Sequence, residues 1–467
     1  MALTRSAQLL LSSYARVLLC AGVLVACPAA AQAQALVDGK MPGACKEAPT
    51  GDAATLQKRK ENLEAEIARQ SKGTKALQRF RASSLRQNQE KLLDVLFAIE
   101  CLPKPEQVAQ VPQFGATRSI AKPSSAKNVI EVTTYYATNR KPTGNAEPVK
   151  FYGADLDGKL QYGRAVVTIP LLHTPGVVET PSLWKLEREP DPNKHFTLKS
   201  VTPLDIDAAR KELADNLQGS KSKSLFLFVH GYNVSLAHAA MRTAQMTHDL
   251  KFQGLAFFYS WPSAGQIRGY WQDEEAARLS EMVFEQLLED LSQLPIDGIY
   301  LVAHSMGSRI VGHALQSRMD KGKETKNLRE LLLAAPDINA EIFRTIIAPK
   351  LSAMQGTRTT IYASSSDMAL KASNVVHGFR RVGETAGGVF TFPRLETVDA
   401  SGASHLSKGL GHFYVVDSSA VIRDMQTIIL RGVSAKLRGL KEIGAQPAPY
   451  WQLPDAGGDA ASRQAPR

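Results

Sequence analysis

The apolar residues of this chain follow two patterns, short unbroken runs and longer stretches with helical spacing. An unbroken run is typical of a parallel strand that is covered on both faces. The predicted strands span residues 129–136, 160–169, 225–229, 255–259, 298–303, 330–335, 358–363 and about 389–398. The predicted helices span residues 205–217, 235–250, 273–293, 307–319, 339–347, 368–376 and 417–431. This alternation predicts an α/β fold with a doubly wound, mostly parallel sheet over residues 129–435.

Other patterns flank and interrupt the predicted sheet. Residues 36–102 contain two stretches of helical spacing separated by a Ser-Lys-Gly break, with Asp52 as a candidate N-cap, and predict a helical hairpin. Residues 103–128, rich in Pro, Gln and Ser, predict a linker. Residues 171–200 are expected to form a covering loop, and residues 436–467 are expected to be a disordered tail.

The first 35 residues have the pattern of a secretion signal. Two arginines precede an apolar run at 17–26, and Ala-x-Ala cleavage sites follow at 31–33 and 33–35. We therefore expect export to the periplasm or beyond. A lipobox-like Leu-Val-Ala-Cys ending at Cys27 leaves a lipid anchor as the alternative. The mature chain would keep Cys45 and Cys101, which we expect to form a disulfide at the open end of the hairpin.

The chain carries a formal net charge of +11. No run of five basic residues and no nucleic-acid motif accompanies this charge, so we expect no nucleic-acid partner. Peripheral contact with an anionic membrane surface is compatible with it. We find no metal-ligand cluster and no cofactor motif in the sequence, so we expect neither a metal nor a cofactor.

Candidate chemistry begins where the strand 298–303 ends. Residues 303–307 are Ala-His-Ser-Met-Gly, followed by helical spacing. The pattern small-x-Ser-x-Gly is typical of a nucleophile elbow, in which a serine is raised on a strained turn between a strand and a helix. The residues two positions away must be small, which Gly307 satisfies fully and Ala303 nearly. The pattern predicts Ser305 as a nucleophile.

The strand 225–229 ends in a second informative motif, Phe-Val-His-Gly-Tyr-Asn at 228–233. In lipases and esterases, a His-Gly at this point supplies half of the oxyanion hole. The N–H of Tyr232 would then act together with the N–H of Met306. The two motifs occur at two strand ends in the expected order, and together they are much more specific than either alone.

These motifs belong to a wider resemblance. The chain resembles a bacterial α/β-hydrolase family of unknown function within the esterase/lipase superfamily. The matching pieces are Tyr-Tyr-Ala-Thr-Asn-Arg (135–140), Tyr-Gly-Arg-Ala (162–165), residues 228–233, Tyr-Ser-Trp-Pro-Ser (259–263), residues 303–307, Ala-Ala-Pro-Asp-Ile (334–338), Ile-Tyr-Ala-Ser (361–364) with Asp367, and Gly-His (411–412). The resemblance implies a fold and a Ser-His-Asp triad, but no particular substrate.

The order Ser, acid, His restricts the other triad members. His377 precedes the last predicted strand and is expected to have a packing or surface role. His405 and His412 both follow that strand; His412 is preferred as the base because it matches the Gly-His motif, and His405 remains the alternative. Asp367 is the preferred acid and Asp337 the alternative. Either aspartate could instead cap the helix that follows it.

Further aromatic and histidine residues surround the predicted site. His230 and His304 are expected to pack beside it rather than act as bases. The aromatic loop 261–272 either faces a ligand or packs around its proline, and the sequence does not separate the two.

Two functions follow from these motifs. The first is a secreted serine hydrolase that cleaves carboxylic esters of small molecules or lipids through an acyl-enzyme. The second is a non-catalytic envelope scaffold or binding protein that retains the hydrolase fold. Labelling of the serine by a mechanism-based probe would discriminate between them.

Overall fold

The computed structural model describes residues 52–71, 84–85, 87–89, 91–92, 94–95, 129–181, 189–265, 270–404, 414–444 and 448–454. Several predictions concern other residues. The signal segment with Cys27, the linker 103–128, the Cys45–Cys101 pair and both candidate bases, His405 and His412, lie outside the described residues.

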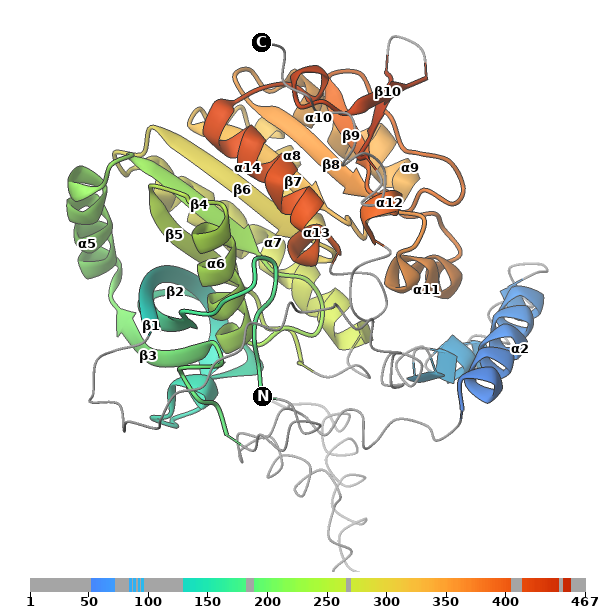
Figure 1. Cartoon of the computed structure of the whole chain (residues 1–467), viewed down its shortest axis with the longest axis horizontal. Helices are drawn as coiled ribbons and strands as arrows, with labels where there is room; N and C mark the ends of the chain where they lie inside the picture. The colour runs from blue at the N-terminus through green and yellow to red at the C-terminus, as the bar shows by residue number, and fades with distance from the viewer. Residues whose placement is uncertain are drawn as a thin grey trace, which may run out of the picture. The chain divides into compact units, whose positions relative to one another are not determined.

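Eleven strands of the described residues form one mixed, mostly parallel sheet (Figure 1). Their order is β10-β11-β9-β8-β7-β6-β4-β5-β1-β2-β3. The strands are β1 Val129–Pro142, β2 Tyr152–Pro170, β3 Thr197–Leu204, β4 Ser224–Val229, β5 Leu255–Ser260, β6 Gly298–His304, β7 Leu328–Ala334, β8 Arg358–Ala363, β9 Leu395–Asp399, β10 Lys441–Ile443 and β11 Tyr450–Gln452. The pairs β1–β2, β2–β3 and β10–β11 are antiparallel, and all the other pairs are parallel. The predicted fold class is confirmed.

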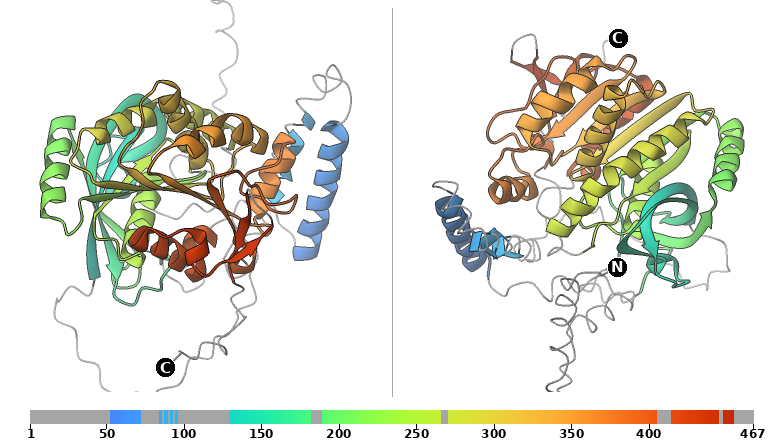
Figure 2. Two further views of the ribbon diagram at one scale, coloured as in Figure 1. Left: turned by 90° about the horizontal axis from the view of Figure 1, so that it is seen from above. Right: turned by 180° about the vertical axis from the view of Figure 1, so that it is seen from behind.

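Helices cover both faces of the sheet. The longer ones are α5 Ile206–Gly219, α6 Leu236–Asp249, α7 Tyr270–Ser292, α8 Gly307–Asp320, α10 Ala348–Ala353, α11 Met368–His377 and α14 Ser419–Arg431. Side chains of α5, α7, α8 and α10 share one apolar core with one face of the strands, and α6 and α14 share another core with the opposite face. Figure 1 shows α6 and α14 in front, and the reverse view in Figure 2 brings the yellow helix α7 forward.

The core strands alternate which face receives each side chain. Leu225, Leu227 and Val229 of β4 contribute to the core with α7 and α8, whereas Phe226 and Phe228 contribute to the core with α6 and α14. Both sets are buried, which is why the sequence of β4 shows an unbroken apolar run.

Three strands lie where none was predicted. β3 begins inside the segment expected to be a covering loop, and β10 and β11 lie inside the segment expected to be a disordered tail, so both predictions are wrong for these residues. β3 is an edge strand that hydrogen-bonds to β2 on one side, and only one of its residues is fully buried. β11 extends the parallel sheet by pairing Trp451 with Val398 of β9. Most residues of β3 are only partly buried, so its sequence shows no unbroken apolar run.

The segment predicted as one helix at 339–347 has a more complex form. Asn339 caps α9 (Ala340–Ile342) by accepting hydrogen bonds from two backbone N–H groups through its side chain. A π-helical turn, η5 (Phe343–Ile347), leads into α10. The helix-capping role considered for Asp337 is therefore wrong, because Asn339 caps this helix.

The described part of the N-terminal hairpin contacts α11. Helix α2 spans Ala53–Ser71, and Asp52 accepts a hydrogen bond from the N–H of Thr55, as predicted for its N-cap. Ile67 and Leu92 are buried together with Ala372 of α11. Gln89 donates a side-chain hydrogen bond to the carbonyl of Val376. Among the described helices, none combines the length and apolar character needed to cross a bilayer.

The short elements that complete the fold are η2 Pro148–Lys150, α12 Ser401–Ser404, α13 Tyr414–Asp417 and η6 Ala435–Leu437. Of these, α13 lies closest in the chain to the predicted base His412.

Candidate active site

Ser305 occupies a strained turn between β6 and α8. Its φ angle is 53°, in the left-handed region that residues with a side chain rarely adopt. Its N–H donates to the carbonyl of Ala334 at 2.9 Å, and its own carbonyl accepts from the N–H of Asp337 at 3.3 Å. These bonds to the last residue of β7 and to the loop after it hold the turn in place. The serine is buried, with 4% of its surface exposed.

Two glycines allow the backbone to pack closely around this turn. A Cβ added to Gly307 would lie 2.3 Å from the carbonyl oxygen of His230, which is a backbone atom and cannot swing away. A Cβ added to Gly231 would lie 2.8 Å from the Cβ of Ser305. The loop after β4 therefore contacts the serine turn directly, and this is the arrangement that the two sequence motifs predict.

A buried arginine from β1 holds the loop after β4. Arg140 is 1% exposed and donates to the carbonyl of Val234 at 2.6 Å and to the carbonyl of Ser263 at 3.1 Å. Burial lowers the pKa of Arg140 to about 9, although the negative charge of Asp273 acts to raise it. Asp273 in turn accepts hydrogen bonds from the N–H groups of Asn233 and Ala264. No local pattern in the sequence marks Arg140 or Asp273 for this role, although Arg140 ends one of the family motifs.

His230 and Trp261 pack together beneath the site. Their rings stack with centroids 5.1 Å apart, and the Trp261 Nε1–H donates to the carbonyl of His230 at 2.7 Å. Burial and the nearby charge of Arg140 lower the pKa of His230 to about 3, so its ring is neutral near pH 7. Both residues are buried, which confirms packing for His230 and decides the Trp261 end of the aromatic loop in favour of packing.

Asp367 follows β8 and is fully buried. Its Oδ1 accepts a hydrogen bond from the N–H of Leu370 at 2.9 Å, so it caps α11. This capping bond uses one carboxylate oxygen. Capping a helix and orienting a histidine are compatible roles, because a carboxylate has several acceptor lone pairs.

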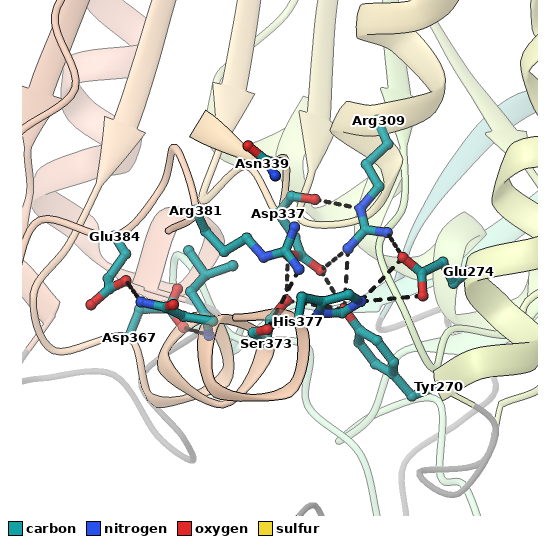
Figure 3. Close-up of polar contacts among 12 residues, drawn as sticks. Tyr270, Glu274, Arg309, Asp337, Asn339, Asp367, Ser373, His377, Arg381 and Glu384 are labelled. Carbon is teal, nitrogen blue, oxygen red and sulfur yellow. Dashed lines mark hydrogen bonds and ion pairs between the residues drawn. The ribbon is translucent and has the colours of Figure 1, made fainter. Parts of the chain in front are cut away.

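Asp337 follows β7 and lies at the centre of a buried polar cluster (Figure 3). Its Oδ1 accepts from Ser373 at 2.7 Å, and its Oδ2 accepts from Tyr270 and from Arg309, each at 2.9 Å. Arg381 lies 3.2 Å from Oδ1. Burial by itself would raise the pKa of Asp337, but the Arg309 and Arg381 guanidiniums hold it below its ordinary value. Three hydrogen bonds and one ion pair therefore surround this carboxylate.

His377 belongs to the edge of the same cluster. Its Nδ1 lies 2.8 Å from the carbonyl of Ser373, and its Nε2 lies 3.2 Å from both carboxylate oxygens of Glu274. Despite the burial of its carboxyl, the contacts with His377 and Arg309 lower the pKa of Glu274 to about 2. The expected packing role of His377 is consistent with these contacts.

The structure thus brings the predicted oxyanion loop and the predicted nucleophile together, and it describes both candidate acids. The polar partners of Asp337 were missed by sequence analysis. Arg309 and Tyr270 occupy helical positions that pattern alone marks only as polar or amphipathic. Their convergence on one carboxylate depends on how α7, α8 and α11 pack.

A mostly parallel sheet with helices on both faces and a strained serine between β6 and α8 defines an α/β hydrolase. Residues 205–423 match the profile of a family described as alpha/beta hydrolase of unknown function, and this segment belongs to that family. The match runs from the N-cap of α5 into α14 and confirms the predicted family.

Other similarities are weaker. An uncharacterized protein of Nostoc sp. is 30% identical over 121 residues, which are 25% of this chain and 29% of that protein. The chain therefore matches less than a third of the length of this curated relative. An esterase of Pyrobaculum calidifontis and a mutant of the esterase rPPE are each 11% identical, with TM-scores of 0.28 and 0.30. They cover 80% and 79% of this chain, and 98% and 94% of their own chains. TM-scores this low do not establish a shared fold, so the fold assignment depends on the topology and the family match.

Proposed function

We propose that this protein is a serine hydrolase that cleaves carboxylic esters through an acyl-enzyme. Ser305 attacks the carbonyl carbon, His412 takes the hydroxyl proton and later returns it to the leaving group, and Asp367 orients His412. The N–H groups of Tyr232 and Met306 stabilise the negative charge on the carbonyl oxygen, each contributing about 3 kcal/mol. Water then hydrolyses the acyl-enzyme by the same steps.

The observation that carries this proposal is the positive φ of Ser305. Strain of this kind costs on the order of 1–3 kcal/mol and persists where the surrounding structure enforces it, often for function. Here it is enforced by backbone hydrogen bonds to Ala334 and Asp337 and by close packing against Gly231. A chain with no use for a hydroxyl at this point could relieve the strain with glycine at position 305.

The contacts of the two candidate acids support Asp367. Asp337 accepts hydrogen bonds from Ser373, Tyr270 and Arg309 and forms an ion pair with Arg381, so an imidazole would have to displace one of these partners. Asp367 follows β8, the strand after that of Asp337, and is fully buried. Replacing Asp367 with Asn should lower kcat by about 10⁴-fold, the size of the effect for an orienting aspartate in a serine triad.

Probe labelling tests the proposal. Wild-type protein and a Ser305→Ala variant are treated with a fluorophosphonate probe and assayed with short p-nitrophenyl esters. Ser317→Ala is the matched control, because Ser317 lies on the same helix, and its hydroxyl donates to Glu285 far from the turn. We expect labelling and hydrolysis by wild type and Ser317→Ala, and neither by Ser305→Ala.

The same experiment separates the hydrolase from a non-catalytic scaffold. A scaffold would leave wild-type protein unlabelled at every probe concentration. Labelling that survives in Ser305→Ala would show that another residue reacts, and the assignment of the nucleophile would be abandoned.

A further inference from the structure

Asp337 connects four helical or loop segments through its side chain. Tyr270 comes from α7, Arg309 from the first turn of α8, Ser373 from α11, and Arg381 from the loop that precedes β9 (Figure 3). The carboxylate is 2% exposed, and Ser373 and Arg381 are each 3% exposed. A single buried group thus contacts elements that are far apart in sequence.

The backbone of Asp337 is bound to the nucleophile turn. Its N–H donates to the carbonyl of Ser305 at 3.3 Å. Its carbonyl accepts from Nε of Arg309 at 2.5 Å, four residues after the serine. Position 337 is therefore fixed relative to the turn that holds the Ser305 hydroxyl, independently of its side chain.

The side chain of Asp337 holds α11 in turn. Ser373, in the middle of α11, donates to Oδ1 at 2.7 Å. Arg381 reaches the same oxygen and also donates to the carbonyl of Ser373. Asp367 is the N-cap of α11, so a shift of this helix would carry the Asp367 carboxylate with it.

We propose that Asp337 is a positioning residue for the proposed hydrolysis, one that sets the distance between the Ser305 turn and the acid Asp367 through Ser373. This proposal rests on the proposed function. Asp337 touches no reacting atom. It acts by keeping α11 in register with the nucleophile turn, so that Asp367 meets the imidazole in the productive orientation.

The chain contains a matched control for this role. Asp424 on α14 is also a buried aspartate that accepts from a tyrosine and an arginine, Tyr362 at 2.7 Å and Arg438 at 2.9 Å. Its partners do not include α8 or α11. Asp424→Asn therefore removes a charge from a comparable cluster without loosening the connection between Ser305 and Asp367.

The test measures kcat, KM and the pH profile of kcat/KM for a short p-nitrophenyl ester in full-length protein. Asp337→Asn should lower kcat by roughly 100-fold, the scale expected for a misplacement of about 1 Å, with little change in KM. The acid limb of the kcat/KM profile should move to lower pH, because a displaced Asp367 stabilises the protonated base less. Asp424→Asn should leave kcat and this limb at wild-type values.

A milder pair of variants covers the case in which Asp337→Asn does not fold. Ser373→Ala removes only the hydroxyl that joins α11 to Asp337, and Ser317→Ala removes a comparable hydroxyl-to-carboxylate bond elsewhere. We expect Ser373→Ala to shift the acid limb in the same direction with a smaller loss of kcat, and Ser317→Ala to change neither.

The outcomes separate the two proposals. If wild type is labelled at Ser305, while Asp337→Asn and Ser373→Ala keep the wild-type kcat and acid limb, the positioning role is refuted and the hydrolase stands. If these variants lower only the melting temperature, as we expect for Asp424→Asn, the role is again refuted. If wild type is never labelled, both proposals fall together.

Discussion

Asp337 and Asp424 are two buried aspartates with similar neighbours and opposite electrostatics. Each accepts hydrogen bonds from one tyrosine and one arginine. Burial raises the pKa of Asp424, and the nearby Glu396 adds to this rise, against the opposing charge of Arg438. The pKa of Asp337 instead lies below its ordinary value despite burial, because two guanidiniums, Arg309 and Arg381, act on it.

The two aspartates show what decides whether the pKa of a buried carboxyl rises or falls. Both carboxylates lose hydration on burial, and both have directional hydrogen bonds. They differ in the charged groups nearby. Two guanidiniums lie near Asp337, whereas one guanidinium and a second carboxylate lie near Asp424. A buried carboxylate that joins several segments can thus remain ionised, and it then holds those segments by charge as well as by hydrogen bonds.

The largest difference between the two sites is expected in the free energy of unfolding, when each carboxylate is removed. Asp337→Ala leaves Arg381 buried without its carboxylate, and we expect a loss of about 3–5 kcal/mol in the free energy of unfolding. Asp424→Ala should cost about 1–3 kcal/mol, because Arg438 keeps Glu396 at 2.8 Å. Urea denaturation of the two variants measures both values. Equal losses would mean that the second guanidinium contributes nothing.

The pH dependence of stability should differ in sign between the two sites. The folded pKa of Asp337 is lowered, so its contribution is present above the unfolded value of 3.8 and is lost as pH falls below it. The folded pKa of Asp424 is raised, so its contribution is full below 3.8 and is lost as pH rises through the folded value.

Stability measured from pH 2.5 to 7 for Asp337→Asn and Asp424→Asn, each relative to wild type, checks this prediction. The deficit of Asp337→Asn should shrink toward acid pH, and the deficit of Asp424→Asn should grow. Parallel curves would contradict the assigned charge states.

The smallest expected difference in stability is between variants that lack the hydroxyl of one of the two tyrosines. Tyr270→Phe leaves Oδ2 of Asp337 with Arg309, so we expect a loss of about 0.5–1.5 kcal/mol. Tyr362→Phe removes the described donor to Oδ2 of Asp424 and should cost about 1–3 kcal/mol. Thermal unfolding resolves a difference of this size, and a larger loss for Tyr270→Phe would reverse the proposed order.

Much of the fold followed from local patterns. The parallel strands β4 to β8 were predicted within a few residues, because a strand covered on both faces must be apolar throughout. The nucleophile turn and the loop after β4 followed from small residues at fixed spacing, and the contacts of Gly231 and Gly307 show why a side chain is excluded there.

The outer strands of the sheet and the long-range polar contacts did not follow from the sequence. β3 and β11 are stabilised by hydrogen bonds to β2 and β9, which leave little trace in side-chain pattern. Asp337 could equally have been an acid or a helix cap, because its local sequence suits both. Its actual partners come from three helices and a loop.

The sequence by itself therefore determined the class of fold, the position of the strained serine and the two motifs that surround it, since each depends on neighbours a few residues away. Only the tertiary structure decided which aspartate is enclosed by arginines and which one caps α11. Charge and hydrogen-bond partners of a buried carboxylate are set by packing between distant segments, and no local pattern encodes that packing.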